Sequence, residues 1–375
     1  MSAVQWIWQR PEWPAFTWQA DALAAPLRAC VQAQGTLLGM AGALDRADEL
    51  HGQLDTLLQN IITSSAIEGE TLNVASVRSS LARRLGLEPD SKPSPRSEGV
   101  AELLLDATRN IDQPLTLERL FSWHRQLFPD EALPLYSAMR VGELRGDEPM
   151  QVVSGRLDRP RVHFEAPRRA GLEAQLERFV QWFADSRADA GLDPLLRAGI
   201  AHFWFVTLHP FDDGNGRLTR AITDLALAQA DGQAIRLYAM SASILADRAG
   251  YYRVLEASQK GGLDITVWLQ WFLATLLDSL QQAIARIERL LTKTRFWQNH
   301  RNHVLSVEQT KVLNRLLDGG ERGFAGGISA SQYQAVAKVS KATATRHLAD
   351  LLEKGCIEKL PGGGRSTRYR VSAGP

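Results

Sequence analysis

One feature constrains the fold of this chain more than any other. It is an almost wholly apolar stretch that is followed by a short segment rich in charged residues and glycine. Residues 195–208 are apolar along nearly their whole length, as expected of a helix surrounded by other helices. Helical spacing resumes over residues 218–230. Residues 209–220 gather a histidine, two aspartates, two glycines and two arginines. This concentration of charge predicts a site for a charged ligand.

The glycines and arginines of this segment indicate that the ligand is a phosphate. Gly214 and Gly216 allow the backbone to turn tightly and to approach a ligand closely. The N–H groups that open the following helix form an anion site with a favourable helix dipole. Arg217 and Arg220 lie three residues apart, on one face of that helix, so both guanidinium groups can bind the same polyphosphate.

The remaining polar side chains suit phosphate chemistry. Asp213 is expected to bind Mg²⁺, which is usually held by a carboxylate together with phosphate oxygens and water. His209 is placed to accept a proton from an incoming hydroxyl group at neutral pH. A calcium loop starting at Asp213 would need other residues where Arg217 and Leu218 stand, and the chain has no Gly-Lys-Ser/Thr motif of a P-loop. The remaining alternative is a Gly-Asn turn between buried helices, with His209 a core histidine.

The order His209-x-Phe211-x-Asp213-Gly214-Asn215-Gly216-Arg217-x-x-Arg220 resembles the signature of the Fic (filamentation induced by cAMP) family at each defining position. The resemblance covers residues 64–277 and implies a mainly α fold, in which a Fic helical core presents the motif beside a short β-hairpin flap. It implies a protein adenylyltransferase, a nucleotidyltransferase that moves AMP from ATP, with Mg²⁺, onto a Ser, Thr or Tyr hydroxyl of a target protein. Gly216 favours AMP transfer over the phosphoryl-transferring branch of the family, in which lysine replaces this glycine.

The resemblance also implies a role for each residue of the site. His209 would be the general base and Asp213 the Mg²⁺ ligand. The phosphates of ATP would be bound by Gly214, Asn215, Gly216, Arg217 and Arg220. Tyr251 and Tyr252 resemble the family's tyrosines on the adenine side, and Gln259 stands where the family often has asparagine.

A second motif of the same family precedes the core. Ser64, Glu68 and Gly69 match its inhibitory pattern of Ser or Thr, three residues, Glu, and Gly or Asn. Gly69 suits the C-terminal cap of a helix, whereas nothing structural requires Glu68. The resemblance implies that Glu68 pairs with Arg220 and inhibits the enzyme. The same glutamate could instead position water for AMP removal, so a de-AMPylating hydrolase is an alternative function.

Helical spacing accounts for most of the remaining chain up to residue 291. It predicts two helices within residues 20–67 and further helices over residues 98–110, 117–127, 172–183, 248–256 and 265–291. The proline-rich segment 87–96 is expected to be a loop. Residues 151–154 and 161–164 are β-prone and predict a hairpin. In the family this hairpin is the flap, so residues 151–164 would dock the target protein by strand addition.

The C-terminal residues resemble a winged helix-turn-helix domain. Three helical patterns are followed by two β-prone runs around a glycine tip at residues 362–364. Residues 301–375 hold 12 Lys and Arg against 6 Asp and Glu, a net charge of +6 in a chain of net +1. Lys338, Lys341 and Arg346 lie where a recognition helix would meet the major groove, so DNA contact through residues 338–370 is expected. Protein contacts or dimerisation are the alternative use of such a domain.

These patterns divide the chain into three parts. Residues 1–95 form a tryptophan-rich arm and helices that include the inhibitory helix, residues 96–295 the catalytic core, and residues 300–375 the winged-helix-like domain. A homodimer, self-modification, and a DNA-binding regulator with a secondary Fic core are further hypotheses.

The cysteines and the start of the chain bear on where the protein works. Cys30 and Cys356 stand far apart, with no Cys-x-x-Cys motif or Cys/His cluster in the sequence, so neither a disulfide framework nor a zinc site is suggested. The chain shows no leader-like start and no apolar run of the roughly 18 residues that a membrane span needs. We therefore expect a cytoplasmic protein without a membrane contact.

Overall fold

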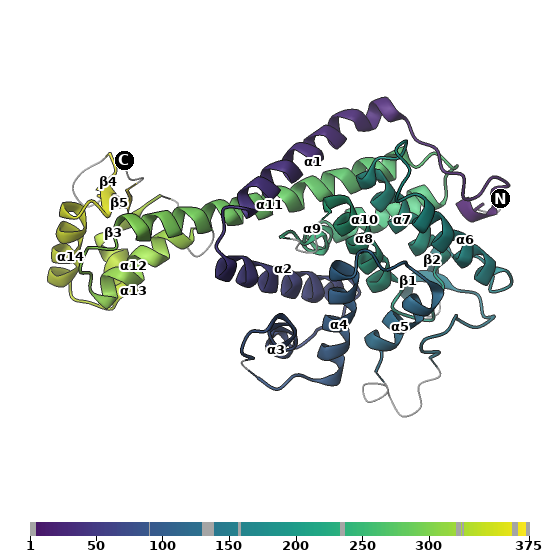
Figure 1. Ribbon diagram of the computed structural model, residues 1–375, viewed down its shortest axis with the longest axis horizontal. Helices are drawn as coiled ribbons and strands as arrows, with labels where there is room; N and C mark the ends of the chain where they lie inside the picture. The colour runs from purple at the N-terminus through teal and green to yellow at the C-terminus, as the bar shows by residue number, and fades with distance from the viewer. Residues whose placement is uncertain are drawn as a thin grey trace. The chain divides into compact units, whose positions relative to one another are not determined.

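The protein divides into two compact units, Met1–Ala283 and Ile284–Pro375. Their structure is a computed structural model that describes residues 5–89, 91–129, 139–156, 159–232, 237–319, 324, 326–361 and 367–372. Helices dominate both units, and a small antiparallel hairpin accompanies those of the first (Figure 1). The fold is thus mainly α, as the sequence predicts. None of the helices within the described ranges is long and apolar enough to span a membrane.

The first unit is built around two buried helices, α7 (Pro194–Leu208) and α8 (Asn215–Asp231). Every residue of α7 from Leu195 to Leu208 is buried, which confirms the central place that its apolar sequence predicts. The helices packed around this pair include α2 (Arg46–Ile67), α4 (Pro95–Arg109) and α5 (Leu117–Leu127) on α8, and α6 (Leu172–Asp185) on α7. The unit also contains α1 (Ala20–Ala41), α3 (Val74–Leu85), α9 (Met240–Ala246), α10 (Arg248–Gln259) and the first part of α11 (Thr266–Asn299).

Short polar side chains define where several of these helices begin. The side chains of Asn73, Ser94, Thr116 and Asp193 each accept a hydrogen bond from a backbone N–H in the first turn of the helix that follows. Ser94 starts α4 at Pro95, a few residues before the predicted start, so the proline-rich loop is shorter than the pattern suggests. Helices α3 and α9 were missing from the sequence prediction.

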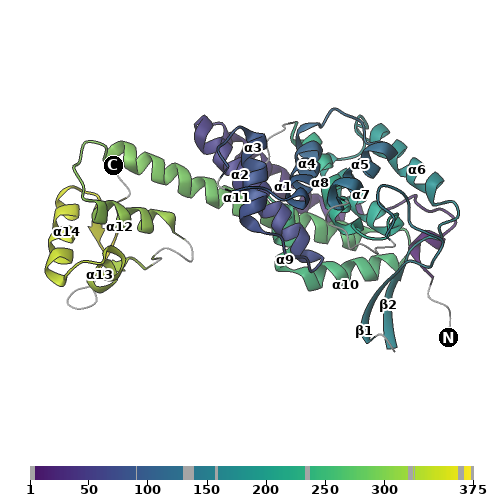
Figure 2. The same cartoon turned by 90° about the horizontal axis from the view of Figure 1, so that it is seen from below.

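The predicted hairpin consists of β1 (Gln151–Arg156) and β2 (Arg159–Glu165), and Figure 2 shows it extending away from the helices. The tryptophan-rich arm contains the short 3₁₀ helix η1 (Ile7–Gln9) and packs against the end of the hairpin nearest the helices. The Trp6 ring packs edge-on against Phe164 with 5.4 Å between centroids. The Nε1 atom of Trp8 donates to the carbonyl oxygen of Glu165 at 2.7 Å. The arm therefore anchors the hairpin to the helical core.

The second unit has the element order of a winged helix-turn-helix domain. After the end of α11 come α12 (Val307–Asp318), β3 (Ile328–Ser329), α13 (Ala330–Ala337), α14 (Lys341–Glu353), β4 (Ile357–Lys359) and β5 (Arg368–Val371). The three strands form one antiparallel sheet in the order β3-β5-β4. Lys338, in the left-handed region at φ 55°, ends α13, and Ser340 caps α14. Strand β3 was not predicted, and the glycine tip lies outside the described residues.

Candidate active site

The loop between α7 and α8 is closed by its own residues. His209 ends α7 with left-handed backbone angles at φ 48°, and Gly214 precedes α8 at φ 80°. The side chain of Asn215 spans the loop, since Oδ1 accepts from the N–H of Phe211 at 3.0 Å and Nδ2 donates to the carbonyl oxygen of Phe211 at 2.8 Å. This side chain therefore shapes the loop, and an anion could be bound by the backbone N–H of Asn215 rather than by its side chain.

Two residues that the sequence prediction missed brace the same loop from outside. His124 on α5 donates from Nε2 to the carbonyl oxygen of Asp213 at 3.0 Å and accepts the N–H of Gly142 on Nδ1 at 2.9 Å. Burial lowers the pKa of His124 below its ordinary value, which suits a neutral ring with one donor and one acceptor. Arg145 donates from Nε to the carbonyl oxygen of His209 at 2.9 Å. In the sequence, the position of His124 on the apolar face of a predicted helix was the only indication of its role. Nothing in the sequence indicated the role of Arg145.

The imidazole of His209 is oriented with one nitrogen available for chemistry. Its Nδ1 lies 3.2 Å from the carbonyl oxygen of Val206, a contact that places the ring proton on Nδ1 and a lone pair on Nε2. Burial lowers the pKa of His209, although the hydrogen bond to Val206 and the negative charge of Glu68 act in the opposite direction. The ring is therefore neutral at neutral pH and able to accept a proton.

Asp213 is the exposed acid of the loop. Its side chain is 60% exposed, and Oδ1 accepts the N–H of Gly214 at 2.6 Å. The same Oδ1 lies 3.6 Å from Nη2 of Arg217. An accessible carboxylate beside a guanidinium could hold a Mg²⁺ ion, which would neutralise the charge of a bound phosphate.

The two arginines of α8 are buried, and each is only partly satisfied. Arg220 donates from Nε to Oγ of Ser64 and from Nη2 to Oε1 of Glu68, both at 2.8 Å. Arg217 donates from Nη1 to Oε2 of Glu70 at 2.6 Å. Nη1 of Arg220 and Nε of Arg217 are buried without a hydrogen-bond partner among the described residues. Buried donors left in this state are expected to face an anionic ligand.

The end of α2 aims both glutamates at these arginines. Gly69, at φ 80°, donates its N–H to Ala66, and Glu70 donates its N–H to Ser65 at 3.0 Å, which together form a Schellman motif. Glu68 and Glu70 flank the glycine in this turn, and both face α8. The C-cap predicted for Gly69 is confirmed, whereas Glu70 was missed because a single glutamate after a helix has no distinctive spacing.

The carboxylate of Glu68 lies against the first turn of α8. A Cβ atom added to Gly216 would overlap Oε1 of Glu68, so the absence of a side chain there is what allows the close approach. Burial alone would raise the pKa of Glu68, but the charge and hydrogen bond of Arg220 and the charge of Arg217 outweigh it and lower the pKa. Glu68 is therefore an ionised carboxylate held in the anion site predicted from the glycines.

A cavity of about 690 Å³ opens beside this carboxylate, which is large enough for a nucleotide-sized ligand. Six of the predicted site residues line it: Glu68, His209, Gly216, Tyr251, Tyr252 and Gln259. The predicted phosphate ligands Arg217 and Arg220 are not part of this lining. The hydroxyl of Tyr251 lies 2.9 Å from Nε2 of the buried His202, so Tyr251 is fixed in place. Nε2 of Gln259 donates to Oγ1 of Thr207 at 3.1 Å.

The hairpin forms one wall of the cavity and is fastened to α10. Nδ1 of His163 lies 2.6 Å from Oε2 of Glu256, and Nη2 of Arg161 lies 3.5 Å from Oε1 of the same glutamate. Partial burial would raise the pKa of Glu256, but hydrogen bonds from Lys260 and His163 lower it to about 2. An ionised Glu256 thus ties the predicted flap to the helix that supplies the two tyrosines.

Three segments of the chain match sequence models of known families. Residues 114–227 match the sequence model of the Fic/DOC family, residues 6–87 a domain of unknown function (DUF4172), and residues 324–372 the C-terminal domain of the DIP2311-like transcriptional regulator. Proteins named protein adenylyltransferase Fic from Drosophila sechellia and Drosophila virilis are each 25% identical, over 59% and 56% of this chain. The matches cover 40% and 39% of those relatives, so this chain spans about two fifths of their length.

Solved structures share the fold. A Fic family protein from Desulfovibrio desulfuricans G20 superposes with a TM-score of 0.54 at 20% identity, covering 96% of this chain and 98% of the other. A Fic domain containing signaling protein from Bacteroides thetaiotaomicron VPI-5482 gives a TM-score of 0.52 at 19% identity, covering 69% and 97%.

The buried helix pair, its glycine-rich anion loop and the hairpin over the cavity define the class of Fic-type folds. Residues 114–227, which contain these same elements, match the Fic/DOC family, so this part of the chain is a Fic domain, as the motif predicts.

Proposed function

We propose that this protein transfers AMP from ATP to a hydroxyl group of a target protein and that Glu68 inhibits the transfer. One observation carries the proposal: an ionised carboxylate is held by Arg220 against Gly216, in a nucleotide-sized cavity that His209 also lines. A carboxylate in this place marks the binding site of an anion. The similarity to proteins named protein adenylyltransferase supports ATP as the source of that anion.

In this proposal His209 is the general base. Nε2 takes the proton of the acceptor hydroxyl, whose oxygen forms a bond to the α phosphorus of ATP. The bond from that phosphorus to the oxygen shared with the β phosphorus breaks, and pyrophosphate leaves with the electron pair. The neutral ring and its contact with Val206 prepare Nε2 for this role.

The arginines and the start of α8 would hold the leaving pyrophosphate. Nε of Arg217 and Nη1 of Arg220 are buried donors without a partner among the described residues, and both are available for phosphate oxygens. Asp213 would hold Mg²⁺, which supplies neutralisation of the charge that develops on the leaving group. Tyr252 and the ring of Tyr251 would line the adenine side of the cavity.

The inhibitory contact follows from competition between carboxylate and phosphate. Nη2 of Arg220 is committed to Glu68, and the Schellman turn at Gly69 fixes the glutamate in that place. A γ phosphate at Arg220 would have to displace a charge-assisted hydrogen bond, so ATP would bind without the geometry that transfer needs. Removing the carboxylate of Glu68 should therefore relieve the inhibition.

The test is incubation with ATP labelled in the α phosphate and Mg²⁺ in a cell lysate. We expect protein-bound label with Glu68→Gly to exceed the wild-type level by roughly tenfold or more, the factor that about 1.4 kcal/mol of lost competition would give. The double variant Glu68→Gly with His209→Ala should lose the label. Equal labelling by wild type and Glu68→Gly would refute the inhibition, and labelling that survives in the double variant would refute the role of His209.

Removal of AMP from a modified protein is the nearest alternative on the same site. In that case Glu68 would position water, and the Glu68→Gly variant would be less active on a modified substrate than the wild type. Protein recovered from the labelling reaction provides that substrate. Faster loss of label with the wild type than with Glu68→Gly would favour the hydrolase.

We propose DNA binding as a second function, located in the second unit. The match of residues 324–372 to the C-terminal domain of a transcriptional regulator favours it. Lys338, Lys341 and Arg346 are exposed around the start of α14, and Arg368 is exposed on β5. Exposed cations on a recognition helix and beside a wing suit phosphate contacts along a duplex.

A further inference from the structure

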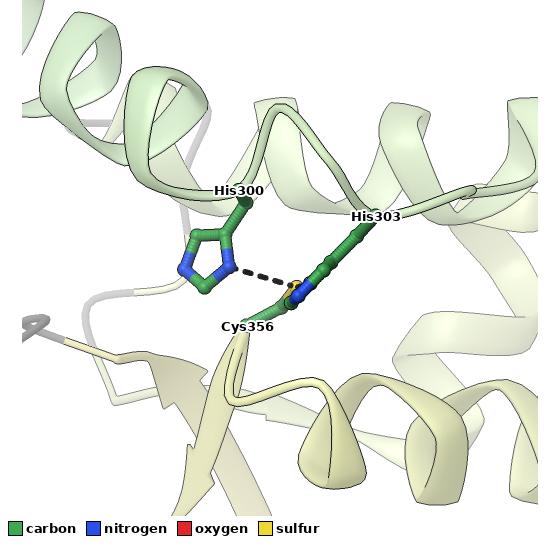
Figure 3. Close-up of side chains that lie close together, drawn as sticks. All are labelled: His300, His303 and Cys356. Atoms are coloured by element: carbon green, nitrogen blue, oxygen red, sulfur yellow. Dashed lines mark hydrogen bonds between the residues drawn. The ribbon is translucent and has the colours of Figure 1, made fainter.

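Three potential metal ligands that lie far apart in the sequence meet in the second unit. Figure 3 shows the imidazoles of His300 and His303 converging on the sulfur of Cys356. Nδ1 of His300 lies 3.6 Å from Sγ, and Nδ1 of His303 lies 3.8 Å from it. The three donor atoms all lie within 4.8 Å of one another. The cluster is separate from the Fic site and is not needed by the proposed transfer.

The backbone around the cluster is well fixed on both sides. The two histidines lie in the turn that follows α11, where the N–H of His303 donates to the carbonyl oxygen of His300 at 3.0 Å. Cys356 lies in the corner between α14 and β4, where Gly355 adopts φ 67° and the N–H of Cys356 donates to Leu351 at 2.9 Å, as in a Schellman motif. The three side chains are thus presented by a helix end and a helix cap.

Lys354, which forms an ion pair with Asp350, connects the turn that bears the histidines to the end of α14. Nζ of Lys354 donates to the carbonyl oxygen of Val304 at 2.9 Å and to Oδ2 of Asp350 at 2.7 Å. The turn that bears the histidines is therefore tied to the last turn of α14. Because this tie does not involve the cluster itself, the three donors are brought together before any ion is bound, which reduces the cost of ordering them.

The two distances from sulfur to nitrogen fit a tetrahedral zinc ion. With Zn–S of about 2.3 Å and Zn–N of about 2.0 to 2.1 Å, the S···N edge of a tetrahedron is about 3.5 to 3.6 Å. The observed separations of 3.6 and 3.8 Å match this edge closely. Two imidazoles and a thiolate are donors that zinc prefers, whereas Mg²⁺ and Ca²⁺ prefer oxygen.

The contrasting explanation is a buried thiol that hydrogen-bonds its neighbours. Cys356 is wholly buried and belongs to the apolar core of the unit. A single S–H group can donate to one imidazole, whereas a metal ion uses all three donor atoms at once. The histidines are half-buried, so one side of the cluster remains open to solvent.

We propose that His300, His303 and Cys356 bind one Zn²⁺ ion, with water in the fourth position. Among the described residues, no fourth His, Cys, Asp or Glu belongs to the cluster. On binding, the thiol proton of Cys356 is released to solvent and a Zn–S bond forms. The ion would link the turn after α11 to the corner between α14 and β4, so zinc should stabilise the second unit by mass action.

The test uses the full, untagged chain, stripped of metal by a chelator and titrated with Zn²⁺ against a chromophoric chelator. Wild type and Cys30→Ser are expected to bind one equivalent that His303→Asn binds at least tenfold more weakly. Cys30 is a matched control because its thiol is also buried, with Sγ 3.2 Å from the carbonyl oxygen of Leu273 in the first unit. With Co²⁺ in place of Zn²⁺, wild type and Cys30→Ser should show a thiolate charge-transfer band that Cys356→Ser lacks.

Thermal melting of the metal-free proteins shows whether each variant is folded, and His303→Asn changes a half-buried side chain so that folding is preserved. Zinc should raise the melting temperature of the second unit in wild type but not in His303→Asn. Equal zinc affinity of wild type and His303→Asn, or a charge-transfer band that persists in Cys356→Ser, would overturn the site. Absence of zinc binding by the folded wild type would overturn it as well.

Discussion

The two arginines of α8 form ion pairs with two different glutamates, Arg220 with Glu68 and Arg217 with Glu70. The Glu70 pair predicts an effect of its own on ATP binding. Glu70 lies between Arg217, at 2.6 Å, and Arg96, at 2.7 Å, and its side chain is 23% exposed. A phosphate that binds Arg217 must compete with this carboxylate even when Glu68 has been removed. If the protein binds ATP as proposed, Glu70 should weaken that binding independently of the Glu68 contact.

Glu70→Gln in the Glu68→Gly background should lower the KM for ATP roughly fivefold, because a half-buried ion pair is worth on the order of 1 kcal/mol. The rate at saturating ATP should change little, since Arg217 binds phosphate throughout. Steady-state labelling at several ATP concentrations measures both quantities. Glu118→Gln is the matched control, because Glu118 pairs with Arg125 at an exposed position on α5. A KM that does not fall would show that Glu70 does not compete with ATP.

The environment of His209 predicts the acid limit of transfer. Glu68 directly after α2, Arg145 between α5 and β1, and Asp213 in the motif carry charges that act on this imidazole, and burial makes the largest contribution to its lowered pKa. Glu68→Gly removes a negative charge that raises the pKa, so the pKa should fall further in the active variant. The base must be neutral, and its neutral form therefore persists below the ordinary histidine pKa of about 6.5.

In Glu68→Gly, kcat/KM for AMP transfer should stay constant as the pH falls from about 8 to about 6.5 and decline only below that range. A pH profile of initial rates measures this limit. Half-loss of activity above pH 6.5 would contradict a depressed pKa for His209. The wild type should remain inhibited over the same range, because the lowered pKa of Glu68 keeps its carboxylate ionised until the pH falls below the ordinary carboxyl range.

Single residues of the site were predictable where the backbone motif itself dictates their place. His209 and Gly216 line one cavity because they belong to one loop and the helix turn that follows it, and Arg220, one turn further along α8, holds Glu68 at that cavity. Glu68 was predictable only because Ser64, Glu68 and Gly69 resemble the inhibitory pattern of the Fic family. Arg145 was not, because it acts through a carbonyl oxygen of His209 that only the folded chain brings close.

At the scale of elements, helices with a clear apolar stripe were predictable and helices with a polar buried face were not. The predicted and observed bounds of α5 agree, and its buried residues follow the helical period. In α3 the buried face includes Ser79 and Ser80, whose hydroxyls bond to Ser91 and Glu98. Buried serines read as polar in a periodicity analysis, so α3 was missed. Helix α9 is too short for its period to be evident.

Two glycines within helices should respond to alanine in opposite ways. In α1, a Cβ at Gly35 would meet nothing within 4 Å, so Gly35→Ala should stabilise the protein by about 0.5 to 1 kcal/mol through helix propensity. In α4, a Cβ at Gly99 would overlap the carbonyl oxygen of Gln126 on α5. Gly99→Ala should therefore destabilise by about 1 to 3 kcal/mol despite the same gain in propensity.

Chemical denaturation of the two variants beside the wild type measures this difference in the free energy of unfolding. The pair is self-controlled, because the substitution is the same and only the neighbouring helix differs. If Gly99→Ala were as stable as Gly35→Ala, the close approach of α4 and α5 would be wrong. Since α5 supplies His124 to the motif loop, a shift of α5 should also reduce transfer.

On the scale of the whole molecule, charge is unevenly shared between the parts. Residues 301–375 carry a net charge of +6, so the remaining residues of the chain of net +1 carry −5. This difference was evident from the sequence, as was the element order of the second unit except for strand β3. The cluster of His300, His303 and Cys356 was not, because α12, β3, α13 and α14 separate the histidines from the cysteine and the three residues share no local motif. A sequence reveals a metal site by the spacing of its ligands only when those ligands lie a few residues apart along the chain.

The basic second unit should bind duplex DNA in a salt-dependent way. Each phosphate contact releases counterions, so the logarithm of the association constant should fall linearly with the logarithm of the salt concentration. Lys341→Ala with Arg346→Ala removes two exposed cations of α14, and it should weaken binding and reduce the slope by about 2.

Lys311→Ala with Arg315→Ala removes the same charge from exposed positions on α12 and is the matched control. Fluorescence anisotropy of a labelled duplex with the full chain measures all three proteins. Equal weakening by the two double variants would show that net charge alone, and not α14, accounts for the binding.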